Sequence, residues 1–179
     1  MRNNKINATT TDEYVLLAKN TIEKYINDGQ IYHPIDVPAE MKQTKAGAFV
    51  SIHKNGNLRG CIGTFLPTCD TLAEEIIQNA ISASTRDPRF NPIEPEELSE
   101  LEINVDILSE PESISSINEL DAKRYGVIVC HGLKRGLLLP DLEGVDTPEQ
   151  QIEICKQKAG ISSYQTDLDL YRFEVVRHK

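Results

Sequence analysis

The sequence contains no tryptophan, and aromatic residues make up only 6% of its 179 residues. It has no apolar run long enough to cross a bilayer, and its first residues, 1–5, lack the apolar core of a secretory signal. Positive charge is also scarce, because 19 Lys and Arg face 28 Asp and Glu, for a formal charge of −9. We therefore predict a cytoplasmic protein with no membrane association. A broad nucleic-acid-binding surface, which needs clustered Lys and Arg, is disfavoured.

Paired cysteines and standard cofactor motifs are absent as well. The four cysteines are far apart and form no C-x-x-C pair, which predicts reduced thiols and disfavours a disulfide scaffold or a zinc site. No histidine pair has H-x-x-x-H spacing, and the chain lacks a phosphate loop, a dinucleotide fingerprint and a G-x-S-x-G elbow. We therefore predict no metal and no cofactor.

The hydrophobic periodicity that is present predicts an α+β fold. Capping boxes at Thr10–Glu13 and Thr71–Glu74, and the Thr147–Gln150 start signal, predict three main helices that end at Gly29, near Ser84 and at Gly160. Residues 1–9 are expected to be a flexible arm, and residues 10–179 to form a single domain. About six strands in a mostly antiparallel sheet are predicted by alternating or apolar runs, at 48–53, 58–65, 101–107, 126–131, 136–140 and 171–177.

The first two strands form a predicted hairpin whose register has two alternatives. The turn is either the two-residue Asn55-Gly56 or a three-residue loop, Lys54 to Gly56, with Gly56 in the left-handed conformation. We favour the three-residue loop because it separates apolar from polar side chains. It places Ala48, Val50, Ile52, Leu58 and Ile62 on one face, and Phe49, Ser51, His53, Arg59 and Cys61 on the other.

The returning strand contains the most informative segment, Leu58-Arg59-Gly60-Cys61-Ile62-Gly63. Glycine weakens a strand, so Gly60 and Gly63 indicate close approach of another backbone, a bulge or a ligand. A cation on the same face, Arg59, would favour the thiolate of Cys61, and His53 is a candidate base across the hairpin. The alternative is that Cys61 is a small apolar residue of the core.

Two further basic segments are candidate anion sites. Arg86 and Arg89 lie in a proline-rich loop and could bind carboxylates or phosphates, since a guanidinium is a rigid fork of donors. They could equally form local ion pairs, with Asp87 as the obvious partner. The turn at 130–135, with His131, Lys134 and Arg135, could bind an anion or simply keep a hairpin soluble, and its role stays open.

The hexapeptide resembles the signature of the AMMECR family, and further blocks follow in the family's order over nearly the whole chain. These blocks are Asp87–Phe90, Glu97-Leu98, Gly136–Pro140 and Lys158–Ile161. Tyr14–Ala18 and Arg172–Val175 resemble the bacterial branch called AmmeMemoRadiSam system protein A. The resemblance implies a larger and a smaller lobe with a cleft near the hexapeptide. It also implies a Memo-like protein and a radical S-adenosylmethionine enzyme as partners, but no settled reaction. The 130–135 turn is less basic than in many relatives.

Three functions follow. The favoured one is a binding or accessory module that holds a small anionic ligand or a partner enzyme at the cleft, through Arg59, Gly60, Cys61, Gly63, Arg86 and Arg89. The second is a thiol-dependent enzyme with Cys61 as nucleophile or redox residue, helped by Arg59 and His53. Nucleic-acid binding is the third and the least supported. Whether a reaction is catalysed, which ligand is bound and how many copies assemble stay open.

Overall fold

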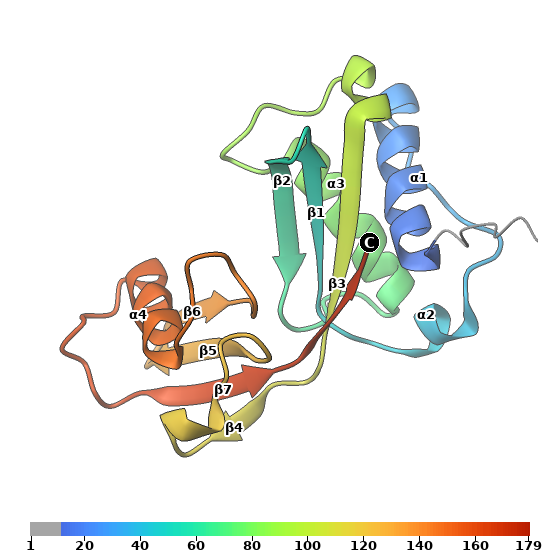
Figure 1. Ribbon diagram of the computed structural model, residues 1–179. Coiled ribbons are helices and arrows are strands. Elements are labelled where there is room, and N and C mark those ends of the chain that lie inside the picture. The colour runs from blue at the N-terminus through green and yellow to red at the C-terminus, as the bar shows by residue number, and fades with distance from the viewer. Residues whose placement is uncertain (1–11) are drawn as a thin grey trace, which may run out of the picture. The chain divides into compact units, whose positions relative to one another are not determined.

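The computed structural model describes residues 12–179, so the predicted arm at 1–9 lies outside the described residues. The chain forms two compact units (Figure 1). The larger unit runs to Val105 and also includes Arg177–Lys179, and the smaller unit is Asp106–Val176. The α+β class and the larger and smaller lobes are confirmed. Residues 12–179 contain eight strands in two sheets of four, against the six expected in a single sheet.

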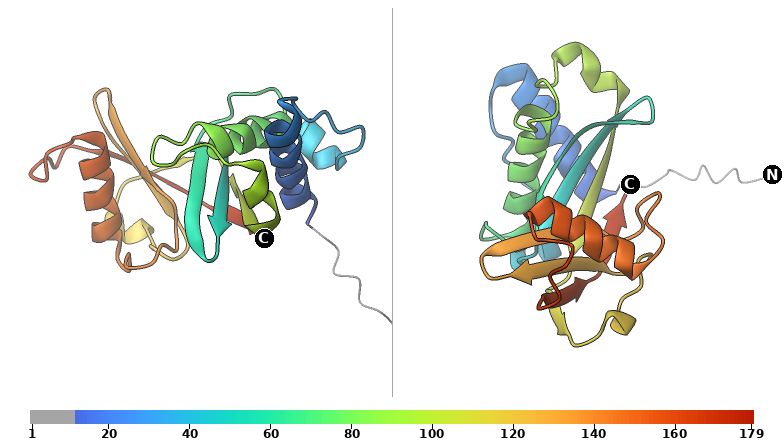
Figure 2. Two further views of the ribbon diagram at one scale, coloured as in Figure 1. Left: turned by 90° about the horizontal axis from the view of Figure 1, so that it is seen from above. Right: turned by 90° about the vertical axis from the view of Figure 1, so that its left-hand side faces the viewer.

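The larger unit is built on a sheet with strand order β2-β1-β3-β8. Its strands are β1 (Ala48–Lys54), β2 (Asn57–Thr64), β3 (Leu101–Leu108) and β8 (Val175–His178), of which β3 and β8 continue into the smaller unit. Helices α1 (Glu13–Asp28) and α3 (Leu72–Thr85) pack against each other, and α3 packs on β1 and β2 (Figure 2). The core between them is apolar, with Ile22, Val50, Ile52, Ile76 and Ala80 fully buried.

Helix α1 begins at Glu13, and its N-cap is Asp12, whose carboxylate accepts hydrogen bonds from the backbone N–H groups of Tyr14 and Val15. The expected N-cap, Thr10, lies outside the described residues, and the capping by Asp12 shows that it was the wrong choice. Gly29 ends the helix in the left-handed conformation, as predicted. The same Asp12 carboxylate lies 2.7 Å from Nδ1 of His178, whose ring stacks on Tyr14 at 4.0 Å.

The β1–β2 hairpin closes through two residues, so the expected three-residue loop is wrong. Lys54 lies opposite Asn57, and Asn55 and Gly56 both have positive φ, as a type I′ turn requires. A bulge then shifts the register, because Ile52 faces Gly60 whereas His53 faces Leu58. The extra residue is Arg59.

The bulge has nearly the same effect on the strand faces as a longer loop would have. Ser51 lies opposite Cys61 and Val50 opposite Ile62, which is the predicted separation of polar from apolar side chains. Leu58 is the exception, because it pairs with His53 and is 39% exposed.

Helix α3 starts at the predicted capping box and ends one residue after the predicted Ser84. The short helix α2 (Ala39–Gln43) was not expected in the polar connector, and it forms where Met41 is fully buried. A 3₁₀ helix, η1 (Pro95–Glu100), leads into β3.

The smaller unit has a second sheet, with strand order β4-β7-β5-β6. Its strands are β4 (Glu112–Ile114), β5 (Gly126–His131), β6 (Lys134–Leu138) and β7 (Asp169–Phe173), with η2 (Ile117–Glu119) after β4. Helix α4 (Pro148–Ala159) packs so closely on β6 that a Cβ at Gly136 would lie 2.0 Å from the Cys155 carbonyl oxygen. The closing strand expected at 171–177 is divided at Glu174 into β7 and β8. Strand β4 was not predicted, because it is too short to show an alternation of apolar and polar residues. Among residues 12–179, no helix is long and apolar enough to span a membrane.

Candidate functional site

The peptide group of Cys61 is held by two side chains of the loop after α3. The Cys61 N–H donates to Oδ2 of Asp87 at 2.9 Å, and its carbonyl accepts from Nη2 of Arg89 at 3.1 Å. Because β2 is an edge strand, Asp87 and Arg89 bind where a further strand would otherwise pair. We call Cys61, Asp87 and Arg89 the edge clamp.

Asp87 is the buried centre of the edge clamp and is only 4% exposed. Oδ1 accepts from the backbone N–H of Arg89 at 3.1 Å and from its Nε at 2.9 Å, and Oδ2 accepts from its Nη2 at 2.7 Å. The hydrogen bonds from Arg89 outweigh burial and hold the pKa of Asp87 well below its usual range. The expected local ion pair of Arg89 is therefore present. The Arg89 side chain remains 54% exposed, whereas Arg86, the C-cap of α3, is exposed and has no ion pair within residues 12–179.

Arg59 is bound to the loop before β3. Its Nε and Nη2 donate to the two carboxylate oxygens of Glu97 at 3.0 and 2.9 Å, and Nη1 and Nη2 donate to the carbonyls of Asn91 and Pro92. The hydrogen bonds from Arg59 lower the pKa of Glu97 to about 2 against the effect of burial. Arg59 was expected to activate Cys61. Its guanidinium instead donates hydrogen bonds to residues that lie 32 to 38 positions further along the chain.

The sulfur of Cys61 is half-buried and lies 3.2 Å from Oγ of Ser51, its partner on β1. His53 faces Leu58, and its ring makes no hydrogen bond with any other described residue. The structure thus brings Cys61 together with Ser51, Asp87 and Arg89. Catalytic roles for Cys61 and His53 stay predictions.

The two glycines of the hexapeptide are explained by packing. A Cβ at Gly60 would lie 2.3 Å from the carbonyl oxygen of Ala83 in α3, and one at Gly63 would lie 2.2 Å from the ring of Phe49. Of the predicted causes, close approach of a backbone and a bulge are both present at this strand.

A buried polar network inside the larger unit was missed at the sequence level. Glu75 is 1% exposed and accepts hydrogen bonds from Thr64, from the hydroxyl and backbone N–H of Thr68, and from the N–H of Cys69. Burial raises the pKa of Glu75, but these hydrogen bonds together lower it below its ordinary value. The available signal was spacing, since Glu75 falls on the same helical stripe as Leu72 and Ile76.

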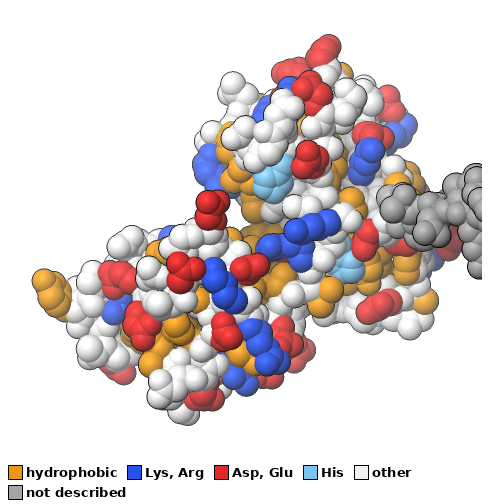
Figure 3. Space-filling model, viewed as in Figure 1, with side chains coloured by type: hydrophobic (Ala, Val, Ile, Leu, Met, Phe, Trp, Pro, Cys, Tyr) orange, Lys and Arg blue, Asp and Glu red, His pale blue; other side chains and the backbone are white. Residues whose placement is uncertain are grey.

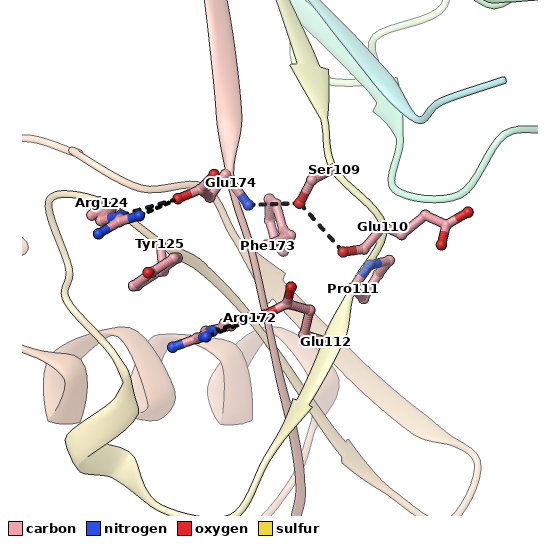
Figure 4. Close-up of a pocket in the computed structure, with 9 residues that line it drawn as sticks. All are labelled: Ser109, Glu110, Pro111, Glu112, Arg124, Tyr125, Arg172, Phe173 and Glu174. Carbon is pink, nitrogen blue, oxygen red and sulfur yellow. Dashed lines mark hydrogen bonds and ion pairs between the residues drawn. The ribbon is translucent and has the colours of Figure 1, made fainter. Parts of the chain in front are cut away.

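Two cavities lie away from the hexapeptide. One of about 410 Å³ lies in the larger unit and includes His33, Cys69 and Asp70. The other, of about 490 Å³, lies in the smaller unit around Tyr125 (Figure 4). Neither cavity contains a hexapeptide residue, so the cleft beside Leu58–Gly63 stays a prediction. No group of three potential metal ligands occurs in the described part of the chain.

Surface charge on the face in Figure 3 is mixed, because Lys and Arg side chains alternate with Asp and Glu without a large area of one sign. Such a face offers no continuous positive track for a nucleic-acid backbone.

The chain is similar to a known protein family and to proteins of several organisms. The AMMECR1 family model matches residues 15–178. A protein of Thermotoga maritima is 54% identical over 168 residues, covering 93% of this chain and 97% of that protein. A protein of Clostridium acetobutylicum is 50% identical over 170 residues, which are 94% of this chain but only 36% of that longer protein.

A solved structure has the same fold. The crystal structure of an uncharacterized protein from Pyrococcus horikoshii superimposes with a TM-score of 0.84 at 32% sequence identity. The match covers 92% of this chain and 88% of that protein, so it includes both compact units.

Proposed function

This chain belongs to the AMMECR1 family, and on that premise we propose that it is a binding and accessory module. It holds a partner enzyme at the surface beside the Leu58–Gly63 hexapeptide. The partners we propose are the Memo-like protein and the radical S-adenosylmethionine enzyme that the family resemblance implies. A small anionic ligand at Arg86 and Arg89 is the other occupant that this surface could take.

The observation that carries the proposal is the set of hydrogen bonds that the polar groups around Cys61 make. Arg59 uses four of its five N–H donors on Glu97 and two carbonyls, and Asp87 accepts hydrogen bonds from Arg89 and the Cys61 N–H. Within residues 12–179, the Cys61 sulfur contacts the hydroxyl of Ser51 and interacts with the guanidinium of Arg89, and neither group is a general base. General-base activation needs a base within hydrogen-bond distance of the nucleophile, so the arrangement favours binding over catalysis.

The same surface has side chains of the kind that bind proteins. Leu58 and Leu66, near either end of β2, are 39% and 46% exposed, and the guanidiniums of Arg86 and Arg89 are exposed. Interfaces are enriched in arginine and in apolar anchors. The Clostridium acetobutylicum relative, in which this region is 36% of the protein, supports a module that works beside a further region of protein.

The test is a binding measurement with the purified Memo-like and radical S-adenosylmethionine proteins of the same organism, by biolayer interferometry. Arg86→Glu and Leu58→Ser should each weaken binding about tenfold or more, roughly 1.4 kcal/mol. Cys61→Ala should change it by less than about tenfold. Lys42→Glu and Ile35→Ser, at exposed positions elsewhere in the larger unit, are the matched controls. Loss of binding with Cys61→Ala alone, or no binding to either protein, would refute the proposal.

A thiol-dependent enzyme is the second candidate, favoured by the half-buried Cys61 sulfur and its 3.2 Å contact with the Ser51 hydroxyl. Alkylation by iodoacetamide at pH 6 distinguishes it, because only an activated thiol reacts quickly there. Fast labelling of Cys61 at that pH would support the enzyme, and slow labelling would count against it.

A further inference from the structure

The cavity of the smaller unit is far in sequence from the hexapeptide and is not explained by the proposed function. It lies where the chain leaves β3 and turns at Pro111 into β4, beside β7 and the segment before β5. Its volume of about 490 Å³ is that of a small-molecule site, which typically measures about 300–1,000 Å³. Phe173, itself 2% exposed, is one of the lining residues in Figure 4, and its ring gives the cavity an apolar wall.

Tyr125 lies between two arginines at one side of this cavity. The guanidinium carbons of Arg124 and Arg172 are 4.8 and 4.6 Å from the centre of its ring. Arg124 donates to Oε1 of Glu174 at 3.0 and 2.8 Å. Arg172 donates from Nε to Glu112 at 3.2 Å and from Nη1 to the Glu119 carbonyl at 3.0 Å. Each guanidinium nevertheless has N–H groups left over, because arginine carries five donors. Figure 4 shows nitrogens of both arginines on the side of the ring where the Tyr125 hydroxyl points.

Two polar groups of the lining have no partner within residues 12–179. One is the hydroxyl of Tyr125, which is a donor flanked by positive charge. The other is the carboxylate of Glu110 on the opposite side, and Figure 4 shows it directed away from both arginines. The apolar atoms of Pro111 and Phe173 lie between these ends. The cavity therefore has a donor-rich end, an apolar middle and an end with one uncompensated negative charge.

We propose that this cavity binds a small amino acid with a basic side chain, such as lysine. The ligand carboxylate lies at the Tyr125 hydroxyl and the free N–H groups of Arg124 and Arg172. Its alkyl chain crosses Pro111 and Phe173, and its terminal ammonium reaches Glu110. Because Arg124 and Arg172 face three carboxylates, Glu110, Glu112 and Glu174, the lining has a net charge of −1. A ligand with a net charge of +1 compensates that charge, whereas a dianion would add to it.

The experiment uses the full chain and follows backbone amide chemical shifts during titration with L-lysine. Norleucine lacks the terminal ammonium, hexylamine lacks the carboxylate, and glutarate has two negative ends. Lysine should shift the amides of Ser109, Glu110, Glu112 and 124–126 saturably. It should bind about tenfold more tightly than the other three, as expected for loss of one charged contact.

Two variants remove one end of the site each. Glu110→Gln and Tyr125→Phe should each weaken lysine binding about fivefold or more, and both replace groups without a hydrogen-bond partner in the described chain, so the fold should persist. Glu143→Gln and Tyr164→Phe, exposed in the same unit, should leave binding unchanged. The proposal is overturned if lysine causes no saturable shift, if norleucine or glutarate binds as tightly, or if both site variants bind like the parent protein.

Discussion

At the scale of single residues, arginines near the hexapeptide act mainly as structural ligands of carboxylates. Arg59 and Glu97, like Arg89 and Asp87, form paired contacts in which two nitrogens bind one carboxyl group. Such fork-shaped contacts fix geometry as well as supplying energy. A lysine at either position would keep the charge and lose the fork, so these positions are specific for arginine.

The four thiols differ in burial, and this gives a prediction for alkylation. Cys155 is fully buried, and burial raises its pKa to about 12. Native protein treated with iodoacetamide at pH 8 should therefore be modified at Cys61 and Cys69, which are half-buried, with Cys130 and Cys155 protected. Burial also raises the pKa of Cys69, which should slow its alkylation. Peptide mass spectrometry identifies the sites, and protein unfolded in urea is the control in which all four react. Rapid labelling of Cys155 in native protein would contradict the described packing.

At the scale of elements, β2 and α3 are in direct backbone contact at Gly60. Gly60→Ala would bring a methyl group to within 2.3 Å of the Ala83 carbonyl oxygen, and neither backbone can move without disturbing β1 or the core. Overpacking of this kind costs about 1–3 kcal/mol or more. Urea unfolding should show such a loss in the free energy of unfolding.

The matched control is Gly144→Ala, which has open space around its Cβ but a φ of +77°. Gly144→Ala should lower the free energy of unfolding only by the cost of placing alanine in the left-handed conformation, about 1 kcal/mol. A Gly60→Ala protein as stable as Gly144→Ala would show that the strand–helix contact can relax.

Local signals predicted the elements better than they predicted the register. The boxes at Thr71 and Thr147 mark helix starts correctly because a cap involves only residues within one turn. The bulged residue, Arg59, makes its side-chain hydrogen bonds to Glu97 and to the carbonyls of Asn91 and Pro92, which are more than 30 residues away, and the hairpin sequence alone does not reveal these partners.

Local features of the candidate site could be predicted from the sequence, whereas its long-range contacts could not. The polar face with Ser51 and Cys61 follows from strand alternation, and the Asp87–Arg89 pair follows from adjacency. That Asp87 would bind the Cys61 N–H was not predictable, since it requires the loop after α3 to return to the edge of β2. The cavity around Tyr125 likewise combines segments separated by up to about 65 residues, and no local pattern marks it.

At the scale of the whole molecule, two carboxylates with lowered pKa values predict acid sensitivity. The pKa of Glu97 falls from 4.5 to about 2 in the folded protein, and that of Asp87 falls further. Their contribution to stability is complete above the ordinary carboxyl pKa and is lost as pH falls through the lowered values. For Glu97 it is roughly 2–3 kcal/mol.

Urea unfolding between pH 6 and pH 2 measures this effect. Glu97→Gln should be less stable than the parent at pH 6, and the difference should shrink as pH falls below about 4.5. Glu96→Gln, an exposed neighbour, is the control and should follow the parent throughout. A constant difference between Glu97→Gln and the parent over the whole range would exclude this linkage.

The order in which the chain is synthesised matters for this architecture, because the larger unit needs residues from both sides of the smaller one. Asp12 at the start of α1 binds His178 on β8, 166 positions later. A ribosome makes α1, α3 and the hairpin first, yet the strand that completes their sheet emerges only after the entire smaller unit. The smaller unit waits almost as long, because β7, which joins β4 to β5 in its sheet, is separated from β8 by Glu174 alone, so the two sheets are completed at nearly the same point of synthesis.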